Sequence, residues 1–250
     1  MSLGQHLVEL RKRLFRGAIA VVAGTIIGWF VLYDFVWHAL REPITVIAEA
    51  HKASINYTSI TSAFDIHLQI AIATGLVISS PFWLYQVFAF FVPGLTGREK
   101  RYIFGFFFTA VPLFLVGCYA GWLVLPHIVE VMASFVPSAD SSFYDAKYYL
   151  DFVLKLVLAT GIAFVLPVFL VLLNFVGVLQ AKTILKGWRW AVLAIAVFTA
   201  IATPAADVVS MFLLAIPMVA LYFVAVFVAM WHDRIAARRA AVFEAGLSGA

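Results

Sequence analysis

The chain has 250 residues, of which 64% are hydrophobic and only 12% are charged, and its formal net charge is +4. A soluble domain carries about 25% charged residues, so the water-soluble protein classes are excluded and a polytopic membrane protein is predicted. There is one cysteine, Cys118, which excludes an internal disulfide and a metal site built on thiolates.

Six apolar segments are long enough, or nearly so, to cross a bilayer, which takes about 20 residues of helix. A lone strand could not satisfy its backbone in lipid, so we predict an all-α membrane protein. The first segment is too long for the apolar region of a cleaved signal peptide, about 7–15 residues, and is expected to remain as a span. The predicted single domain covers 1–250, with spans at about 17–37, 66–92, 102–125, 149–176, 188–202 and 208–231.

The shape of the bundle is predicted from its prolines and from its short fifth segment. A proline inside a helix removes a backbone hydrogen bond and bends the helix, and a short span thins the bilayer or leans on its neighbours. Together these features predict a curved, concave bundle, although prolines are also simply common in membrane helices. Prolines inside spans two, three, four and six are Pro81, Pro112, Pro167 and Pro217.

Most of the 17 lysines and arginines lie in four segments on one side of the predicted membrane. By the positive-inside rule that side is cytoplasmic, which places the N-terminus and the tail 232–250 in the cytoplasm. The outer loops, at about 38–65 and 126–148, contain ITVIAEA and HIVEVMASF, for which we expect short helices along the outer interface. Cations assigned to the inner side are Arg11, Lys12, Arg13, Arg16, Arg98, Lys100, Arg101, Lys182, Lys186, Arg189, Arg234, Arg238 and Arg239.

Before the first span, HLVELRKRL places the carboxylate of Glu9 in a run of cations. Leucines at positions 3, 7, 10 and 14 form one apolar face, so this stretch is predicted to be an amphipathic helix at the inner surface. Glu9 and Arg13 are an i,i+4 pair in the favourable orientation, worth a few tenths of a kcal/mol. That pair is one explanation of Glu9, and recognition of a ligand is the other.

A second lone carboxylate, Glu99, stands between Arg98 and Lys100 in PFWLYQVFAFFVPGLTGREKRY, residues 81–102. Alone it neutralises its neighbours, but Glu9 is predicted at the same depth on the same face. Two carboxylates accept two guanidinium groups in bidentate fashion, while the surrounding cations repel a merely basic peptide. The pair therefore predicts a site for a ligand with adjacent guanidinium groups.

These two stretches, and a TP…D turn before the last span, resemble the TatC family, core receptors of the twin-arginine protein translocase. The resemblance runs from about His6 to Asp233. It implies a non-enzymatic receptor of the prokaryotic inner membrane that binds twin-arginine signal peptides of folded proteins at the cytoplasmic face. It also implies single-span TatA/TatB-type partners, self-association in a larger complex, transport driven by the proton-motive force, and neither a cofactor nor a nucleic-acid partner.

The resemblance also assigns individual residues. The signal-recognition carboxylates of the family fall on Glu9 and Glu99, and surrounding binding positions fall on Arg13, Gln86, Phe90 and Arg101. Structural or partner-contact positions fall on Pro43, Pro93, Leu95 and Asp207, the last in a turn that is one residue longer than the TPPD of the family.

One departure concerns the fourth span. The family often carries a glutamate just before its proline, and this chain has Val165 there, in GIAFVLP. A carboxylate at mid-membrane is costly and usually functional, so any mechanism that rests on it is in question here.

Alternatives are a small-molecule secondary transporter, an intramembrane hydrolase and a structural membrane scaffold. A transporter favours ionisable groups at mid-membrane and repeat symmetry, and neither is evident. A hydrolase needs a nucleophile and base at depth, and no GxSxG-type elbow is present. Only the paired carboxylates Glu9 and Glu99 favour a receptor over a structural scaffold. Two outer-side residues, Asp151 and Lys155, are expected to neutralise each other.

Overall fold

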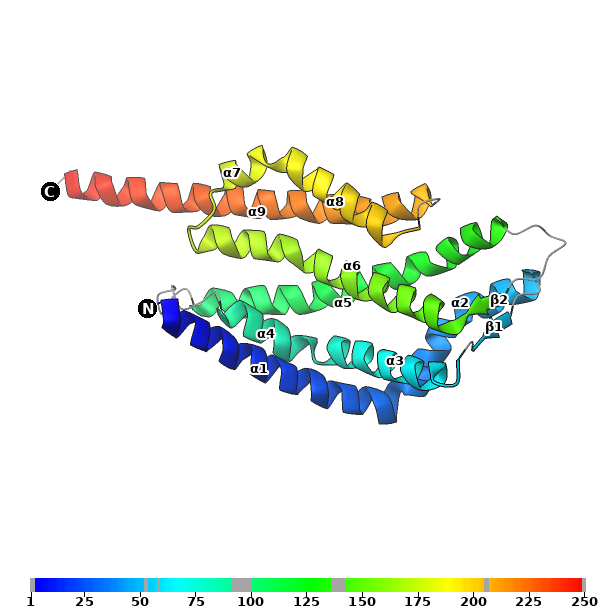
Figure 1. Cartoon of the computed structure of the whole chain (residues 1–250). Coiled ribbons are helices and arrows are strands. Elements are labelled where there is room, and N and C mark those ends of the chain that lie inside the picture. Colours follow the sequence, from blue (N-terminus) through cyan, green and yellow to red (C-terminus); the bar gives the residue numbers. More distant parts are fainter. Residues whose placement is uncertain are drawn as a thin grey trace.

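The structure is a computed structural model that describes residues 3–51, 54–57, 59–90, 100–135, 143–204 and 207–248. Long helices lie side by side, and two three-residue strands pair at one end of the bundle (Figure 1). The elements are, in order, α1 (Leu3–Ile27), the π-helical turn η1 (Gly28–Leu32), α2 (Tyr33–His51), β1 (Ser54–Asn56), α3 (Ser62–Ile78), α4 (Ser80–Phe90), α5 (Lys100–Ser134), β2 (Phe143–Asp145), α6 (Ala146–Phe175), α7 (Ala181–Lys186), α8 (Trp188–Ala202) and α9 (Val208–Ser248).

The all-α class is confirmed, whereas the count of six spans stays a prediction. Among the described residues, four helical runs are long and apolar enough to cross a membrane: Leu7–Glu42, Gly105–Ser134, Ala146–Phe175 and Val208–Arg239. The bent pair α3 and α4 makes a fifth if it is one span. The remaining apolar helix, α8, has only 15 residues and has the bounds predicted for the short fifth span.

The first helical run is longer than the sequence predicts. The apolar pattern ends near Trp37, and ITVIAEA reads as a separate interfacial helix in a loop. Instead α1, η1 and α2 follow one another without a gap, and α2 continues past Pro43 to His51. The expected interfacial helix is therefore the C-terminal part of the first run.

The predicted bend in the second span lies at Ser79. Helix α3 ends at Ile78, α4 begins at Ser80, and the two axes differ by 59°. Pro81 occupies the first turn of α4, where its missing N–H has no helical partner to lose. Trp83 bridges the break, since its Nε1–H donates to the carbonyl of Leu76 at 2.9 Å. By contrast, α5, α6 and α9 continue through their prolines.

Glycines bring the first run into close contact with α3. A Cβ on Gly24 would lie 2.6 Å from the carbonyl oxygen of Gly75, and one on Gly75 would collide with the backbone nitrogen of Thr25. Small residues at such crossings let two helix backbones approach in a membrane. About two turns further along, His67 of α3 stacks on Tyr33 with ring centroids 3.5 Å apart. This contact packs the His67 ring against the first helical run.

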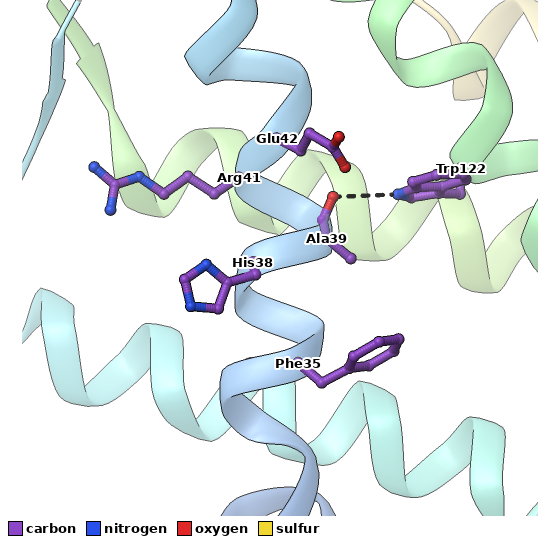
Figure 2. A pocket seen from close by; sticks show the side chains of 6 residues that line it. All are labelled: Phe35, His38, Ala39, Arg41, Glu42 and Trp122. Atoms are coloured by element: carbon purple, nitrogen blue, oxygen red, sulfur yellow. Dashed lines mark hydrogen bonds between the residues drawn. The ribbon is translucent and has the colours of Figure 1, made fainter.

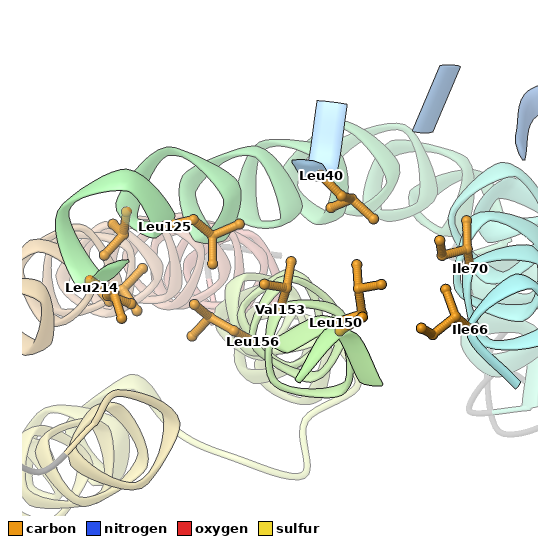
Figure 3. Packing of buried hydrophobic residues seen from close by; sticks show 11 residues of the cluster. Leu40, Ile66, Ile70, Leu125, Leu150, Val153, Leu156 and Leu214 are labelled. Carbon is orange, nitrogen blue, oxygen red and sulfur yellow. The ribbon is translucent and has the colours of Figure 1, made fainter. Parts of the chain in front are cut away.

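The main apolar core joins α2, α3, α5, α6 and α9 (Figure 3). Leu40 meets Ile70 and Leu150 there, and the hydroxyl of Tyr149 donates to the carbonyl of Leu40 at 3.0 Å. At the same end β1 pairs with β2 in parallel register, and Lys147 of α6 forms a 2.6 Å ion pair with Asp65 of α3. The predicted pair of Asp151 and Lys155 is also present.

We predict that Gly75→Ala destabilises the protein, because the new Cβ would collide with the backbone of α1 at Thr25. Overpacking of this kind costs about 1–3 kcal/mol. Gly105→Ala is the matched control, since a Cβ at that exposed position of α5 meets nothing within 4 Å. Thermal unfolding in detergent measures both variants. A Gly75→Ala protein as stable as the Gly105→Ala protein would contradict the close α1–α3 crossing.

Candidate functional site

A groove of about 680 Å³ lies between α1 and α4, and three of the predicted binding residues line it. These are Arg13 of α1 and Gln86 and Phe90 of α4. Gln86 and Phe90 are four residues apart and so share one face of α4, as Arg13 and Gly17 do on α1. The rest of the lining is mainly apolar and comprises Leu10, Leu14, Ala18, Val21, Val22, Leu76, Trp83 and Val87.

Glu9 stands beside this groove and is paired with Arg13, as the i,i+4 spacing predicts. The Oε1 atom of Glu9 accepts from Nη2 of Arg13 at 2.6 Å and from Nε at 3.0 Å. Both side chains are about three-quarters buried, at 23% and 24% exposed. Because both bonds use Oε1, the other carboxylate oxygen accepts nothing from the described residues and is open to a further donor.

Gln86 supplies a second acceptor without a described partner. Its Oε1 atom is buried and has no hydrogen-bond partner among the described residues. A buried acceptor without a donor costs about 1–3 kcal/mol, and nearly all such groups in native proteins find a partner. In a groove with apolar walls, an N–H donor on a bound ligand would relieve that cost.

Several predicted site residues have side chains that the structure does not describe. Glu99, Pro93 and Leu95 lie outside the described residues. Arg101 and Pro43 belong to α5 and α2, but their side chains are outside the described part. The juxtaposition of Glu9 with Glu99 therefore stays a prediction.

The apolar wall of the groove is the feature that sequence reasoning missed. The stripe that begins with the leucines of HLVELRKRL continues along α1 through Leu14 and Ala18 to Val22. That continuation was a signal for an apolar face, but apolar residues in a span also face lipid. Only the position of α4 beside α1 shows that part of this face lines a groove.

A family model described as "Sec-independent protein translocase protein (TatC)" matches residues 5–217. This chain belongs to the TatC family. It is 48% identical to the Sec-independent protein translocase protein TatC of Xylanimonas cellulosilytica, over 96% of this chain and 88% of that protein. The TatC of Rothia mucilaginosa is 38% identical over 98% of this chain and 85% of that protein.

A crystal structure named "Twin Arginine Translocase Receptor- TatC in DDM" superposes with a TM-score of 0.77. It is 31% identical and covers 90% of this chain and 99% of its own. The resemblance read from the two sequence stretches is thus confirmed over most of the chain. As a TatC protein with several apolar helices, the chain is a membrane component of a protein translocase, a family of receptors and not of enzymes.

Within the described part of the chain, no three His, Cys, Asp or Glu side chains come together as a possible metal site. The groove offers instead one guanidinium, one amide and aromatic surface, with a carboxylate at its edge. Such a set can bind a basic, partly apolar peptide through hydrogen bonds and burial of apolar surface.

The TatC glutamate position of the fourth span is occupied here by a packed valine. Val165 of α6 is 2% exposed and belongs to an apolar cluster with Phe88 of α4 and Phe114 and Cys118 of α5. The cluster joins apolar side chains of three helices around Val165. In this chain the position serves packing.

We predict that Val165→Glu destabilises the protein, because the carboxylate would enter this apolar cluster. A charged side chain at mid-membrane without a partner costs about 3 kcal/mol. Val165→Leu, which keeps the site apolar, is the control and should unfold within a few degrees of the parent protein. Thermal unfolding in detergent measures both. If Val165→Glu unfolds no earlier than Val165→Leu, the described cluster is wrong.

Asp207 is buried at the start of α9 and does not line the groove. Its Oδ1 accepts from the backbone N–H of Ser210 at 2.9 Å, which is the geometry of a helix N-cap. His127 of α5 approaches the same oxygen, with Nε2 3.9 Å away. The TP…D turn, one residue longer than in the family, thus still places its acid as the cap of the last helix.

We predict that Asp207→Ala lowers stability by about 1 kcal/mol, because α9 loses its N-cap. Asp207→Asn keeps a side-chain oxygen for the Ser210 N–H and should recover most of that loss. Chemical or thermal unfolding in detergent compares the two. Equal losses for alanine and asparagine would show that the charge of Asp207, and not its cap, is what matters.

Proposed function

We propose that this TatC-family protein is the receptor subunit that binds twin-arginine signal peptides of folded cargo. The observation that carries the proposal is the placement of two acceptors, the Glu9 carboxylate beside an apolar groove and the Gln86 amide in its lining, where the buried Gln86 Oε1 has no described partner. Guanidinium groups present several N–H donors in a rigid fork and bind carboxylate and amide oxygens with fixed geometry. Glu99 is proposed to complete the site as the second carboxylate.

Arg13 is proposed to hold the Glu9 carboxylate in place until a signal arginine binds. The internal pair occupies one oxygen and shields the acid from other cations. A ligand guanidinium can then reach the second oxygen without breaking the pair. Binding therefore costs little free energy for rearranging Glu9 and Arg13. The surrounding positive charge repels peptides that are basic but lack the guanidinium geometry.

The same proposal covers location and partners. Both termini are proposed to face the cytoplasm, with the groove at the inner surface of the prokaryotic plasma membrane, because most cations lie at that end. TatA/TatB-type single-span proteins and further copies of this chain are proposed as partners. The proton-motive force is proposed as the source of energy.

We predict that a fluorescent twin-arginine signal peptide binds this protein in nanodiscs more tightly than a twin-lysine peptide of equal charge. Lysine lacks the planar fork, so it cannot satisfy both acceptors in the same geometry. Glu9→Gln should weaken the twin-arginine peptide about 10- to 100-fold, the loss of one charge-assisted pair. Fluorescence anisotropy at near-physiological salt measures the affinities.

The matched control is Glu130→Gln, which removes an exposed carboxylate at the far end of α5 from the groove. It should leave both affinities unchanged. Equal binding of the two peptides, or equal losses in Glu9→Gln and Glu130→Gln, contradicts the receptor site. In that case Glu9 serves only the helix pair with Arg13, and the scaffold alternative gains support.

A further inference from the structure

Helix α7 is a short amphipathic element that lies against α9, away from the paired strands (Figure 1). Its buried side chains, Ala181 and Ile184, pack on α9. The hydroxyl of Tyr222 donates to the carbonyl of Ile184 at 2.6 Å, and the carboxylate of Asp233 accepts from the N–H of Ala181 at 2.9 Å. Because these contacts hold both turns of α7 on α9, its other side is a fixed surface.

Three cations lie on this other side of α7 and at the start of α8. Lys182 and Lys186 are exposed and stand one helical turn apart, and Arg189 is exposed in the first turn of α8. None of the three forms an ion pair with a described residue. Asp233 is close to α7, but both of its oxygens already accept hydrogen bonds. Like charges at i,i+4 repel each other, so an anion bound between the lysines would stabilise this face.

Exposed apolar side chains adjoin the three cations. The guanidinium of Arg189 lies over the ring of Trp188, with Cζ 5.7 Å from the ring centroid, and Trp190 is 76% exposed. Leu193 and Val197 then continue an exposed stripe along α8 at the spacing of one helix face. The surface therefore offers positive charge at one end and a strip of apolar side chains next to it.

The length of α8 brings this surface within reach of lipid headgroups. A helix of 15 residues measures about 22 Å, whereas the hydrocarbon core of a bilayer is about 30 Å thick. The bilayer thins beside a span that is too short, and tryptophans such as Trp188 and Trp190 favour the depth of the headgroups. The side chains of Lys186 and Arg189 are long enough to meet a phosphate there.

Charges at the opposite end of the molecule are arranged differently. A cavity of about 630 Å³ lies there between α2 and α5, where Arg41 and Glu42 project to opposite sides of α2 (Figure 2). Lys147 is paired with Asp65 at the same end. An anionic headgroup at that end would meet charges of both signs, whereas the surface of α7 and α8 presents cations alone. The lining of the cavity is Phe35, His38, Ala39, Arg41, Glu42 and Trp122.

We propose that the basic face, formed by Lys182, Lys186, Trp188, Arg189 and Trp190, binds an anionic phospholipid of the phosphatidylglycerol type. The two lysines and the arginine bind the phosphate through charge-assisted hydrogen bonds, and an acyl chain lies along the exposed stripe of α8. Basic surfaces beside membrane helices recognise anionic headgroups in this way. By the proposed orientation the lipid belongs to the inner leaflet.

Charge and shape together favour this occupant. A zwitterionic lipid carries an ammonium group that the three cations repel, and a soluble anion would leave the tryptophans and the stripe of α8 uncovered. The bilayer around the protein supplies a ligand that is both anionic and apolar. The basic face is built from α7 and α8, and the signal-peptide groove from α1 and α4, so the two sites are tested separately.

Native mass spectrometry of the detergent-solubilised protein, titrated with dioleoyl phosphatidylglycerol or dioleoyl phosphatidylcholine, tests the proposal. The parent protein should retain one phosphatidylglycerol about 10-fold more tightly than phosphatidylcholine, which has the same acyl chains. The double variant Lys182→Gln, Lys186→Gln should weaken phosphatidylglycerol about 10- to 30-fold, because each cation near the membrane surface attracts anionic lipid. Its affinity for phosphatidylcholine should stay the same. Lys182→Arg, Lys186→Arg keeps both charges and should keep the preference.

The matched control is the double variant Arg238→Gln, Arg239→Gln, which removes two exposed cations of α9 outside the basic face. Its net charge equals that of the glutamine variant of the two lysines, and it should bind phosphatidylglycerol like the parent. Thermal unfolding without added lipid shows that each variant is folded. Equal losses in the two glutamine variants would show an effect of net charge and overturn the proposal.

Two further outcomes also overturn the proposal. One is equal retention of the two lipids by the parent protein, or retention of neither, which would leave the basic face to water or to an acidic protein. The other is displacement of bound phosphatidylglycerol by excess inorganic phosphate, which would show a phosphate site that makes no use of the acyl chain. A lipid that stays bound in phosphate and is lost only from the Lys182→Gln, Lys186→Gln protein supports it.

Discussion

The close crossing of α1 and α3 is the constraint on which the rest of the structure depends. Because Gly24 and Gly75 lack side chains, the two backbones meet almost directly, which fixes the C-terminal part of α1 against α3. Helix α4 then turns away by 59° after Ser79. Helix α1 packs against α4 as well as α3, and the groove lies between α1 and α4.

The bend and the groove are joined by one side chain. Trp83 donates to Leu76 across the break, and both residues line the groove. The carbonyl of Leu76 is one of those that a helix end leaves without an internal partner. The tryptophan thus stabilises the bend with a hydrogen bond and supplies the wall of the groove with its ring. Fold and site use the same residue there.

Composition and local pattern predicted what depends on one segment alone. The all-α class, the bounds of α8, the Glu9–Arg13 pair and the break near Pro81 are of this kind. Contacts between residues of different segments could not be predicted from composition and local pattern. Neither the unfilled acceptor of Gln86 nor the placement of Arg41 opposite Glu42 follows from spacing, because each depends on which helix lies alongside. The continuation of α2 past Pro43 was missed because an X-Pro step usually ends a helix.

Continuity of the first helical run links the two ends of the molecule. Arg13 lines the groove at one end, Arg41 lines the cavity at the other, and α1, η1 and α2 connect them without a gap. The C-terminal part of the run is held in the core through Leu40, and its π-helical turn is held by His67. The N-terminal turns, which carry Glu9 and Arg13, pack against α4 beside the groove. One continuous helical run therefore sets the position of the carboxylate proposed to recognise a signal arginine relative to the main apolar core.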